Sequence, residues 1–428
     1  MRSIWVSKID SSEINLSEKK ENYIEISSLR EDNHLNLKKI KNINFLENET
    51  IRDDKNEFKK INSDNSDNKF LAFENCVFKD FEIEDYKDEL RFINCIFENI
   101  TLKNRFDNII FEDCTINDKF IITNYLSLKD QKLSAGNNVI IFNRGSISEF
   151  LIYGASNFEH SLYINHNSQN KLEIVNLNIS SCIFEKDFSF HNVIIKNAEI
   201  KDCDFNSLSE FIDSEFIEKF DFQEITYKGF TLFDDCTFNT KAEFKYIIFE
   251  KFTSFRGSKF NKGIDLEYTS SDKEINFYGI EISDKNSTSQ ETYRIIKNQF
   301  EKLNNKIEAN KYHALEMEQH RKTIWERIFN DCNSFLKLLP DGIVLFIHKL
   351  SSNHSSNWFL ALFWIFVVSL ITSWSLDSVT VNNFFKYINI LLKIEDFNNS
   401  YIAMTLNKVS LGYLYYQFLT AVRKDTRK

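Results

Sequence analysis

A motif of six residues recurs through the first two thirds of the chain and limits the folds open to it. Three consecutive copies lie at residues 73–78, 92–97 and 111–116, and each reads F-x-x-C-x-F or F-x-x-C-x-I, with evenly spaced cysteines at positions 76, 95 and 114. A helix repeats its apolar residues every three or four positions, and a half-buried strand repeats them every second position. The five-residue step between the large residues fits neither pattern. Such a repeat buries its apolar side only when coils stack, so it predicts a four-sided β-solenoid.

The motif resembles that of the pentapeptide-repeat family, in which a large central residue follows a small one by two positions, as Phe78 follows Cys76. The resemblance covers about residues 70–282 and implies a right-handed quadrilateral β-helix. The later cysteines, at positions 182, 203 and 236, are irregularly spaced, which we interpret as looped insertions in a degenerate repeat. The predicted ladder of inward residues is Phe73, Cys76, Phe78, Phe92, Cys95, Phe97, Phe111, Cys114, Ile116, Cys182, Phe184, Cys203, Phe205, Cys236 and Phe238.

The cysteines are predicted to pack in the core. Six of the seven occupy the small position of the motif, where a free cysteine behaves as a small hydrophobic residue. No C-x-x-C pair or Cys/His cluster has the spacing of a zinc site, and His313 and His320 have no third ligand nearby in the sequence. Neither a metal nor a cofactor is therefore expected. Reduced thiols, and an N-terminus without the apolar run of a signal peptide, predict a cytoplasmic solenoid.

Charge is distributed unevenly along the chain. Residues 286–428 carry 17 Lys and Arg against 12 Asp and Glu, whereas the remainder carries 36 against 51. An acidic N-terminal part and a basic C-terminal part are expected to bind different partners. The sequence holds no Walker A loop, no G-x-S-x-G and no H-E-x-x-H, so an enzyme is not expected.

The sequence predicts four regions. Residues 1–68 form a polar, partly irregular cap, and residues 69–285 form the solenoid. Residues 286–339 form a helical coupler, with one helix over 291–303 capped by Thr292, a second reaching Trp325, and a third over 324–339 along an anionic membrane face. Residues 340–428 form a membrane region.

Two membrane spans are predicted, over residues 358–376 and 402–422. The first has no charge between its terminal tryptophans, and its length gives about 28 Å of helix, close to the thickness of the hydrocarbon core. The second is less apolar and contains Asn407, Lys408 and Gln417. The positive-inside rule places both ends of this helical hairpin in the cytoplasm. The predicted membrane anchors are Trp358, Trp364, Trp374, Arg423 and Lys424.

The C-terminal part resembles the tail of bacterial membrane-anchored pentapeptide-repeat proteins, on residues 293–300, 316–318, 349–353 and 411–418. Some members of that group end in a two-helix module that resembles a potassium channel. This chain has no glycine between positions 342 and 412, so it lacks a T-V-G-Y-G-like filter. Potassium selectivity is therefore not expected.

The leading hypothesis is a multi-pass inner-membrane protein whose cytoplasmic solenoid is a recognition or assembly surface coupled to the hairpin. Its expected partners are the lipid bilayer, further copies of the chain and a protein bound on the solenoid, with no nucleic acid. The hairpin could form an oligomeric pore with Asp377, Glu395 and Asp396 as an acidic ring. The alternatives are a membrane-tethered scaffold without transport, and an acidic rod that mimics DNA and binds gyrase, as some soluble pentapeptide-repeat proteins do.

Overall fold

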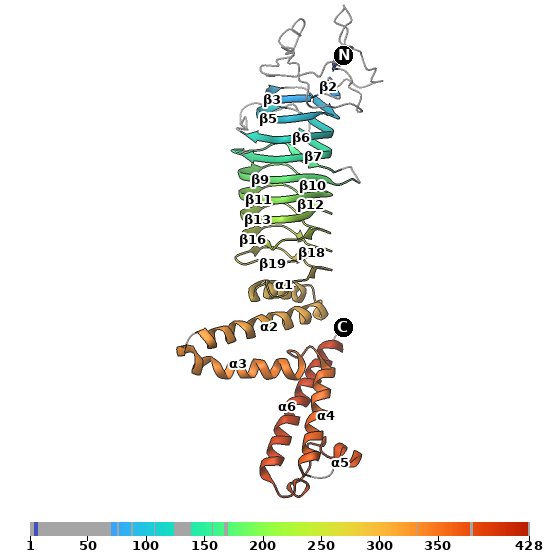
Figure 1. The fold of residues 1–428 in the computed structure, drawn as a ribbon, viewed down its shortest axis with the longest axis vertical. Coiled ribbons are helices and arrows are strands. Elements are labelled where there is room, and N and C mark those ends of the chain that lie inside the picture. The colour runs from blue at the N-terminus through green and yellow to red at the C-terminus, as the bar shows by residue number, and fades with distance from the viewer. Residues whose placement is uncertain are drawn as a thin grey trace, which may run out of the picture. The chain divides into compact units, whose positions relative to one another are not determined.

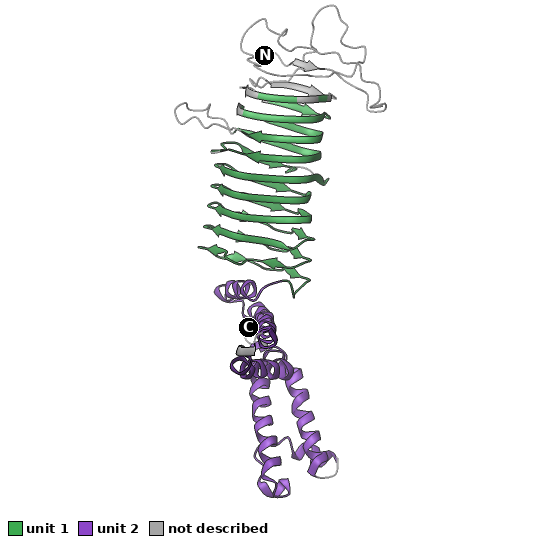
Figure 2. Ribbon diagram, turned by 60° about the vertical axis from the view of Figure 1, so that its left-hand side comes forward, with its two compact units in different colours: residues 1–287 green, residues 288–428 purple. Residues whose placement is uncertain are grey.

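The computed structural model divides the chain into two compact units, Met1–Ser287 and Thr288–Lys428 (Figure 2). The expected cap over residues 1–68 lies outside the described residues, apart from Ile4–Val6. The structure describes residues 4–6, 70–74, 77–86, 89–106, 108–123, 138–155, 157–166, 170–330, 332–376 and 380–426.

The first unit is a β-solenoid of about eight turns, which confirms the solenoid predicted from the motif (Figure 1). Every strand pairing among the described residues is parallel, and each strand pairs with its equivalent one turn later, as Phe205 pairs with Tyr227. The strands are β1 (Ile4–Val6), β2 (Phe70–Glu74), β3 (Val77–Tyr86), β4 (Glu89–Ile93), β5 (Ile96–Phe106), β6 (Ile109–Thr123), β7 (Val139–Tyr153), β8 (Ser161–Ile164), β9 (Leu172–Phe184), β10 (Phe188–His191), β11 (Val193–Phe205), β12 (Ser209–Ile212), β13 (Glu215–Tyr227), β14 (Thr231–Leu232), β15 (Thr237–Phe238), β16 (Ala242–Phe249), β17 (Thr253–Ser254), β18 (Lys259–Phe260), β19 (Ile264–Asp265), β20 (Ser270–Ser271), β21 (Ile275–Asn276) and β22 (Glu281–Ile282).

Stacked aromatic rings fill the solenoid. Successive strands are about 4.8 Å apart, so equivalent side chains on successive turns lie directly above one another. One stack contains Phe184, Phe205, Tyr227 and Phe249, with ring centroids 4.8, 5.0 and 5.4 Å apart. Each fully buried ring contributes about 1.5–3 kcal/mol of transfer free energy. The high phenylalanine content of the chain thus supplies the core of this unit.

The predicted ladder residues lie in this core wherever their side chains are described. All of those residues are at most 2% exposed, and the five described cysteines of the ladder are free. Cys76 and the side chain of Phe73 lie outside the described part of the chain. The thiol of Cys114 contacts the carbonyl oxygen of Phe92 on an adjacent turn at 3.4 Å.

The cysteines belong to two separate columns of the solenoid. Cys203 pairs with Cys182 on one neighbouring turn and with Ile225 on the other. The long interval before Cys236 therefore reflects a change of column, and the interpretation of this interval as a looped insertion is wrong. The other column contains Cys95, Cys114, Gly145, Leu172, Val193, Ser214, Cys236 and Ser258.

Longer turns occur elsewhere in the solenoid. Ile109 of β6 pairs with Ile140 of β7, a longer interval along the sequence than that from Phe92 to its partner Phe111. The turn that separates β8 from its partner β10 is also long. The strands on either side of both long turns remain paired in parallel, with one register shift between Ile116 and Lys119 of β6, so the additional residues do not interrupt the parallel ladder.

The second unit is helical. Tyr293, Ile296 and Phe300 lie on the buried face of its first helix, and the rings of Tyr293 and Phe300 pack against Tyr312 of the second. The N-cap of the first helix is Ser289, whose side chain accepts a hydrogen bond from the backbone of Thr292, so the predicted Thr292 cap is wrong. The elements are α1 (Gln290–Lys302), α2 (Lys306–Asn330), α3 (Cys332–Ser352), α4 (Trp358–Leu376), α5 (Val381–Lys386), η3 (Ile394–Phe397) and α6 (Tyr401–Thr426).

The predicted helix over residues 324–339 is wrong, because the chain reverses within it. Helix α2 ends at Asn330, and α3 begins at Cys332 and continues through Pro340 to Ser352. The two helices approach closely at Gly342, where a Cβ atom would lie 2.9 Å from the side chain of Ile328. The missing side chain at Gly342 therefore lets α3 pack back against α2.

Candidate functional site

Helix α4 has the bounds predicted for the first span. Among the described residues, it is the one helix long and apolar enough to cross a membrane. Most of its surface is uncovered: Phe359 is 64% exposed, Ile371 is 54% exposed and Trp374 is 75% exposed. Soluble proteins rarely expose a continuous apolar surface of this extent. The surface of α4 is therefore a candidate for contact with lipid or with another chain.

Exposed large apolar residues extend from α4 to the neighbouring helices. Helix α3 exposes them along its length, and α6 exposes them on the side away from α4. In this part of the second unit the exposed set comprises Phe335, Leu336, Ile343, Val344, Phe346, Ile347, Leu350, Trp358, Phe359, Phe363, Phe366, Leu370, Ile371, Trp374, Val381, Phe385, Leu391, Tyr401, Ile402, Leu406, Val409, Tyr416 and Leu419.

Helices α4 and α6 pack against each other and run antiparallel. Trp358 at the start of α4 contacts Phe418 near the end of α6. Near the opposite end, the amide of Asn407 donates to the hydroxyl of Thr372 at 3.0 Å. The second predicted span, residues 402–422, lies within α6, which is less apolar than α4 because it includes Asn407 and Gln417.

The predicted anchors occupy different environments. Trp358 and Trp374 lie at the two ends of α4 and are 41% and 75% exposed. The indole nitrogen of Trp364 instead donates to the carbonyl oxygen of Leu350 at 2.8 Å, so this residue connects α4 to α3. Arg423 and Lys424 lie in the last turn of α6.

Two of the three predicted ring residues lie in η3. Glu395 is exposed, whereas the carboxylate of Asp396 accepts a hydrogen bond from the backbone of Lys393 at 3.0 Å. The same carboxylate lies 3.5 Å from the ammonium group of Lys386. Asp396 therefore stabilises its own turn. Asp377 lies outside the described residues.

A polar cluster connects α2, the end of α3 with the segment that follows it, and α6. The side-chain oxygen of Gln417 accepts hydrogen bonds from Ser352 at 3.0 Å and from Ser355 at 2.7 Å. On α2, Glu318 accepts from Arg321 at 2.9 Å and from Lys349 at 2.5 Å. Burial opposes ionisation of Glu318, but these two cations lower its pKa to about 2. Glu318 is therefore a carboxylate at neutral pH.

His354 completes this polar cluster and is fully buried. Its Nε2 lies 3.7 Å from the Glu318 carboxylate, and neither ring nitrogen has a hydrogen-bond partner among the described residues. Burial lowers the pKa of His354 to about 4, and the neighbouring His348 acts in the same direction. His354 is thus neutral at physiological pH.

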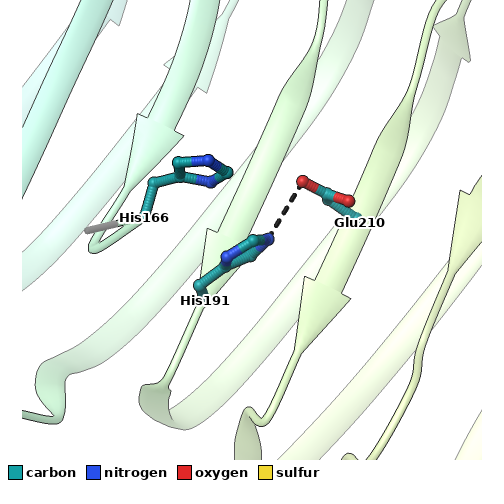
Figure 3. Close-up of side chains that lie close together, drawn as sticks. All are labelled: His166, His191 and Glu210. Atoms are coloured by element: carbon teal, nitrogen blue, oxygen red, sulfur yellow. Dashed lines mark hydrogen bonds and ion pairs between the residues drawn. The ribbon is translucent and has the colours of Figure 1, made fainter. Parts of the chain in front are cut away.

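A second cluster lies on the solenoid and consists of His166, His191 and Glu210. Figure 3 shows the three side chains pointing toward one another from neighbouring turns. The Nε2 atom of His191 lies 2.9 Å from a carboxylate oxygen of Glu210, and the two imidazole centroids are 4.4 Å apart. One nitrogen or oxygen from each residue lies within 4.8 Å of those from the other two.

The carboxylate of Glu210 is the most enclosed group of this cluster. Glu210 is only 6% exposed, while His191 is partly exposed and His166 is exposed. The hydroxyl of the fully buried Ser189 donates to Glu210 at 2.8 Å. Burial opposes ionisation, but hydrogen bonds from His191 and Ser189 hold the pKa of Glu210 below its usual value. The carboxylate is therefore charged at neutral pH.

Sequence reasoning missed the cluster because its members lie far apart along the chain and share no local motif. Only the register of β8, β10 and β12 brings them together, since Tyr163 pairs with Ser189 and Ser189 pairs with Glu210. The turn between β8 and β10 is one of the long ones. Counting a constant repeat along the sequence would therefore misplace His166 relative to His191.

Comparisons with protein-family models, curated proteins and solved structures each returned no match. The class of the protein is therefore defined by the fold itself: a β-solenoid followed by C-terminal helices with one apolar candidate span.

Proposed function

We propose that this protein is a membrane-anchored β-solenoid of the pentapeptide-repeat type. In this proposal the solenoid is right-handed and lies in the cytoplasm, where it binds a protein partner. Helices α4 and α6 cross the inner membrane as a hairpin and hold the solenoid at its surface. The observation that carries the proposal is the long, uncharged and largely exposed helix α4.

The surroundings of α4 support insertion in lipid. In water, the many exposed large apolar residues on α3 to α6 would favour aggregation, whereas lipid chains would cover them. The exposed tryptophans at the ends of α4 suit the two interfaces of a bilayer. Arg423 and Lys424, at the end of α6, suit the cytoplasmic side under the positive-inside rule.

The internal contacts favour an anchor over a pore. A conducting path needs polar groups that face a lumen. Here Asn407 and Gln417 are buried and bond to Thr372 and to Ser352 and Ser355 of the same chain. We therefore favour the scaffold hypothesis, in which the hairpin tethers the solenoid without transport.

The surface of the solenoid supports a protein partner over DNA mimicry. A DNA mimic needs continuous negative charge, but lysines separate the carboxylates here. Lys201 contacts Glu199 and Asp221, and Lys241 contacts Glu243 and Asp265. The exposed rings of Tyr246 and Tyr268 also stack, and such aromatic groups are enriched in protein interfaces.

Membrane fractionation tests the anchor. Phe366 and Leu370 are both exposed on α4, so the double substitution Phe366→Arg, Leu370→Arg preserves the contact with α6. Each arginine adds about 2.5–3.5 kcal/mol to the cost of inserting the helix. We expect the unmodified protein to remain in the membrane pellet after an alkaline carbonate wash and the double variant to be released or degraded.

The matched control places the same two charges on the solenoid, as Tyr246→Arg and Ile248→Arg, where both residues are also exposed. This variant should remain in the pellet. Release of the unmodified protein by carbonate, or full retention of the α4 variant, would argue against membrane insertion of α4.

A further inference from the structure

We propose that His166, His191 and Glu210 form a binding site for a divalent transition-metal ion of the Zn²⁺ type on the side of the solenoid. Two imidazoles and one carboxylate are a common ligand set for zinc, with water or an external ligand in the fourth position. The site is independent of the membrane anchor, because all three ligands belong to the first compact unit.

The parallel ladder sets the positions of the ligands. His191 ends β10 and Glu210 lies in β12, while His166 lies two residues beyond the end of β8, the neighbouring strand of β10. Bonds of about 2.0–2.2 Å in a tetrahedral site place ligand atoms about 3.3–3.5 Å apart. The 2.9 Å separation between His191 and Glu210 is already close to this value.

His166 has the freedom to complete the site. The ligand atoms lie within 4.8 Å of one another, so His166 must approach by at most about 1.5 Å. Its side chain is exposed and follows the end of a strand, where rotation about its side-chain bonds moves the ring without disturbing the ladder. Binding therefore needs a local adjustment and no change in the solenoid.

Ser189 supplies the outer support that metal ligands require. Its hydroxyl donates to Glu210 and lies 3.3 Å from Nδ1 of His166. The ring centroid of Tyr163 lies 5.3 Å from that of His166. The hydroxyl of Tyr163 donates a hydrogen bond to the carboxylate of Asp187 at 3.1 Å. Outer groups of this kind fix the orientation of a ligand and raise metal affinity.

A simple ion pair does not account for the whole arrangement. One histidine suffices to pair with Glu210, and His191 already does so. The second imidazole has its centroid 4.4 Å from the first, where two protonated rings would repel each other. Two imidazoles and one carboxylate grouped within 4.8 Å of one another instead offer three ligand atoms to one cation.

The test uses the full-length chain in detergent, without a polyhistidine tag, after treatment with a chelator. Titration with Co²⁺ reports tetrahedral nitrogen and oxygen coordination through visible absorption bands, and competition with Zn²⁺ gives the zinc affinity. We expect one metal ion per chain. His166→Ala and Glu210→Gln should each weaken binding by at least about 10-fold, the lower limit even for loss of an outer-shell group.

Matched controls separate this site from other donors. Glu215→Gln removes a carboxylate on the next strand, and His320→Ala removes a histidine of the helical unit; neither should change the affinity. Because His166 is exposed, His166→Ala should keep the circular dichroism spectrum of the unmodified protein. Three results would overturn the proposal: no binding, equal affinity in His166→Ala, or a thiolate-to-cobalt absorption band that assigns the metal to cysteine.

Discussion

At the corners of the solenoid, the residue before the core position adopts the left-handed backbone conformation. Asn94, Asp113, Asp202 and Asp235 all have φ between 52° and 56°, and each precedes a cysteine of the motif. Asparagine and aspartate tolerate this conformation better than most residues. The motif therefore encodes a corner as well as two core positions, and the small cysteine fits where the backbone turns.

Among the residues of the column that contains Cys95 and Cys114, Gly145 leaves the least space for a side chain. Its φ is +109°, and a Cβ atom there would lie 1.8 Å from the carbonyl oxygen of Cys114. We expect Gly145→Ala to destabilise the solenoid by about 3 kcal/mol or more, because backbone strain adds to a clash that the paired strand cannot relieve. Thermal unfolding followed by circular dichroism in the strand region measures this change.

Gly154 provides the control for this prediction. Its φ is +69°, but nothing lies within 4 Å of an added Cβ. Gly154→Ala should therefore cost only about 1 kcal/mol of backbone strain. Equal shifts of the melting temperature in the two variants would contradict the packing argument at Gly145.

At the scale of the elements, the segment between α3 and α4 joins the helices through buried polar groups. Asn353, His354 and Ser355 are consecutive residues with positive φ, so the chain turns sharply there. The turn buries His354 beside Glu318 of α2 and places Ser355 against Gln417 of α6. The packing of α2, α3 and α6 against one another thus depends on this one short segment.

Because of the buried His354 in this segment, we expect the free energy of unfolding of the helical unit to fall in acid. The folded protein keeps His354 neutral, with a pKa of about 4, whereas the unfolded chain binds a proton near pH 6.5. The unfolded state therefore holds more protons between these values, and stability falls as the pH drops from 6.5 to 4, by at most about 3 kcal/mol. Glu318, Lys349 and His348 are the ionisable groups that face this ring.

Further loss should follow below pH 4.5, because the unfolded chain then binds a proton at Glu318 while the folded protein keeps this carboxylate ionised down to its pKa of about 2. His354→Asn tolerates a positive φ and carries no proton, so its melting temperature should fall less between pH 6.5 and 4. Unfolding followed by helical circular dichroism across this range gives the comparison. His320→Asn is the control, and an unchanged pH profile in His354→Asn would refute the assignment.

At the scale of the whole molecule, the features that could be predicted from the sequence are those that depend on neighbouring residues along the chain. The spacing of Cys76 and Phe78 predicted the solenoid, and the uncharged run from Trp358 predicted α4 with its correct bounds. The reversal between α2 and α3 was missed because the apolar pattern continues across it, while the contact at Gly342 is tertiary. The cluster of His166, His191 and Glu210 was missed because turn lengths, set by loops, decide which residues become neighbours.

The central proposal is that α4 and α6 cross the membrane and leave the solenoid in the cytoplasm. Asn382→Cys, in α5 between the two helices, tests it directly because this residue is exposed. A membrane-impermeant thiol reagent should label this variant in intact spheroplasts, above the background of the unmodified protein. Ser283→Cys, on the solenoid side, should be labelled only after lysis. Labelling of Asn382→Cys only after lysis would contradict a crossing hairpin.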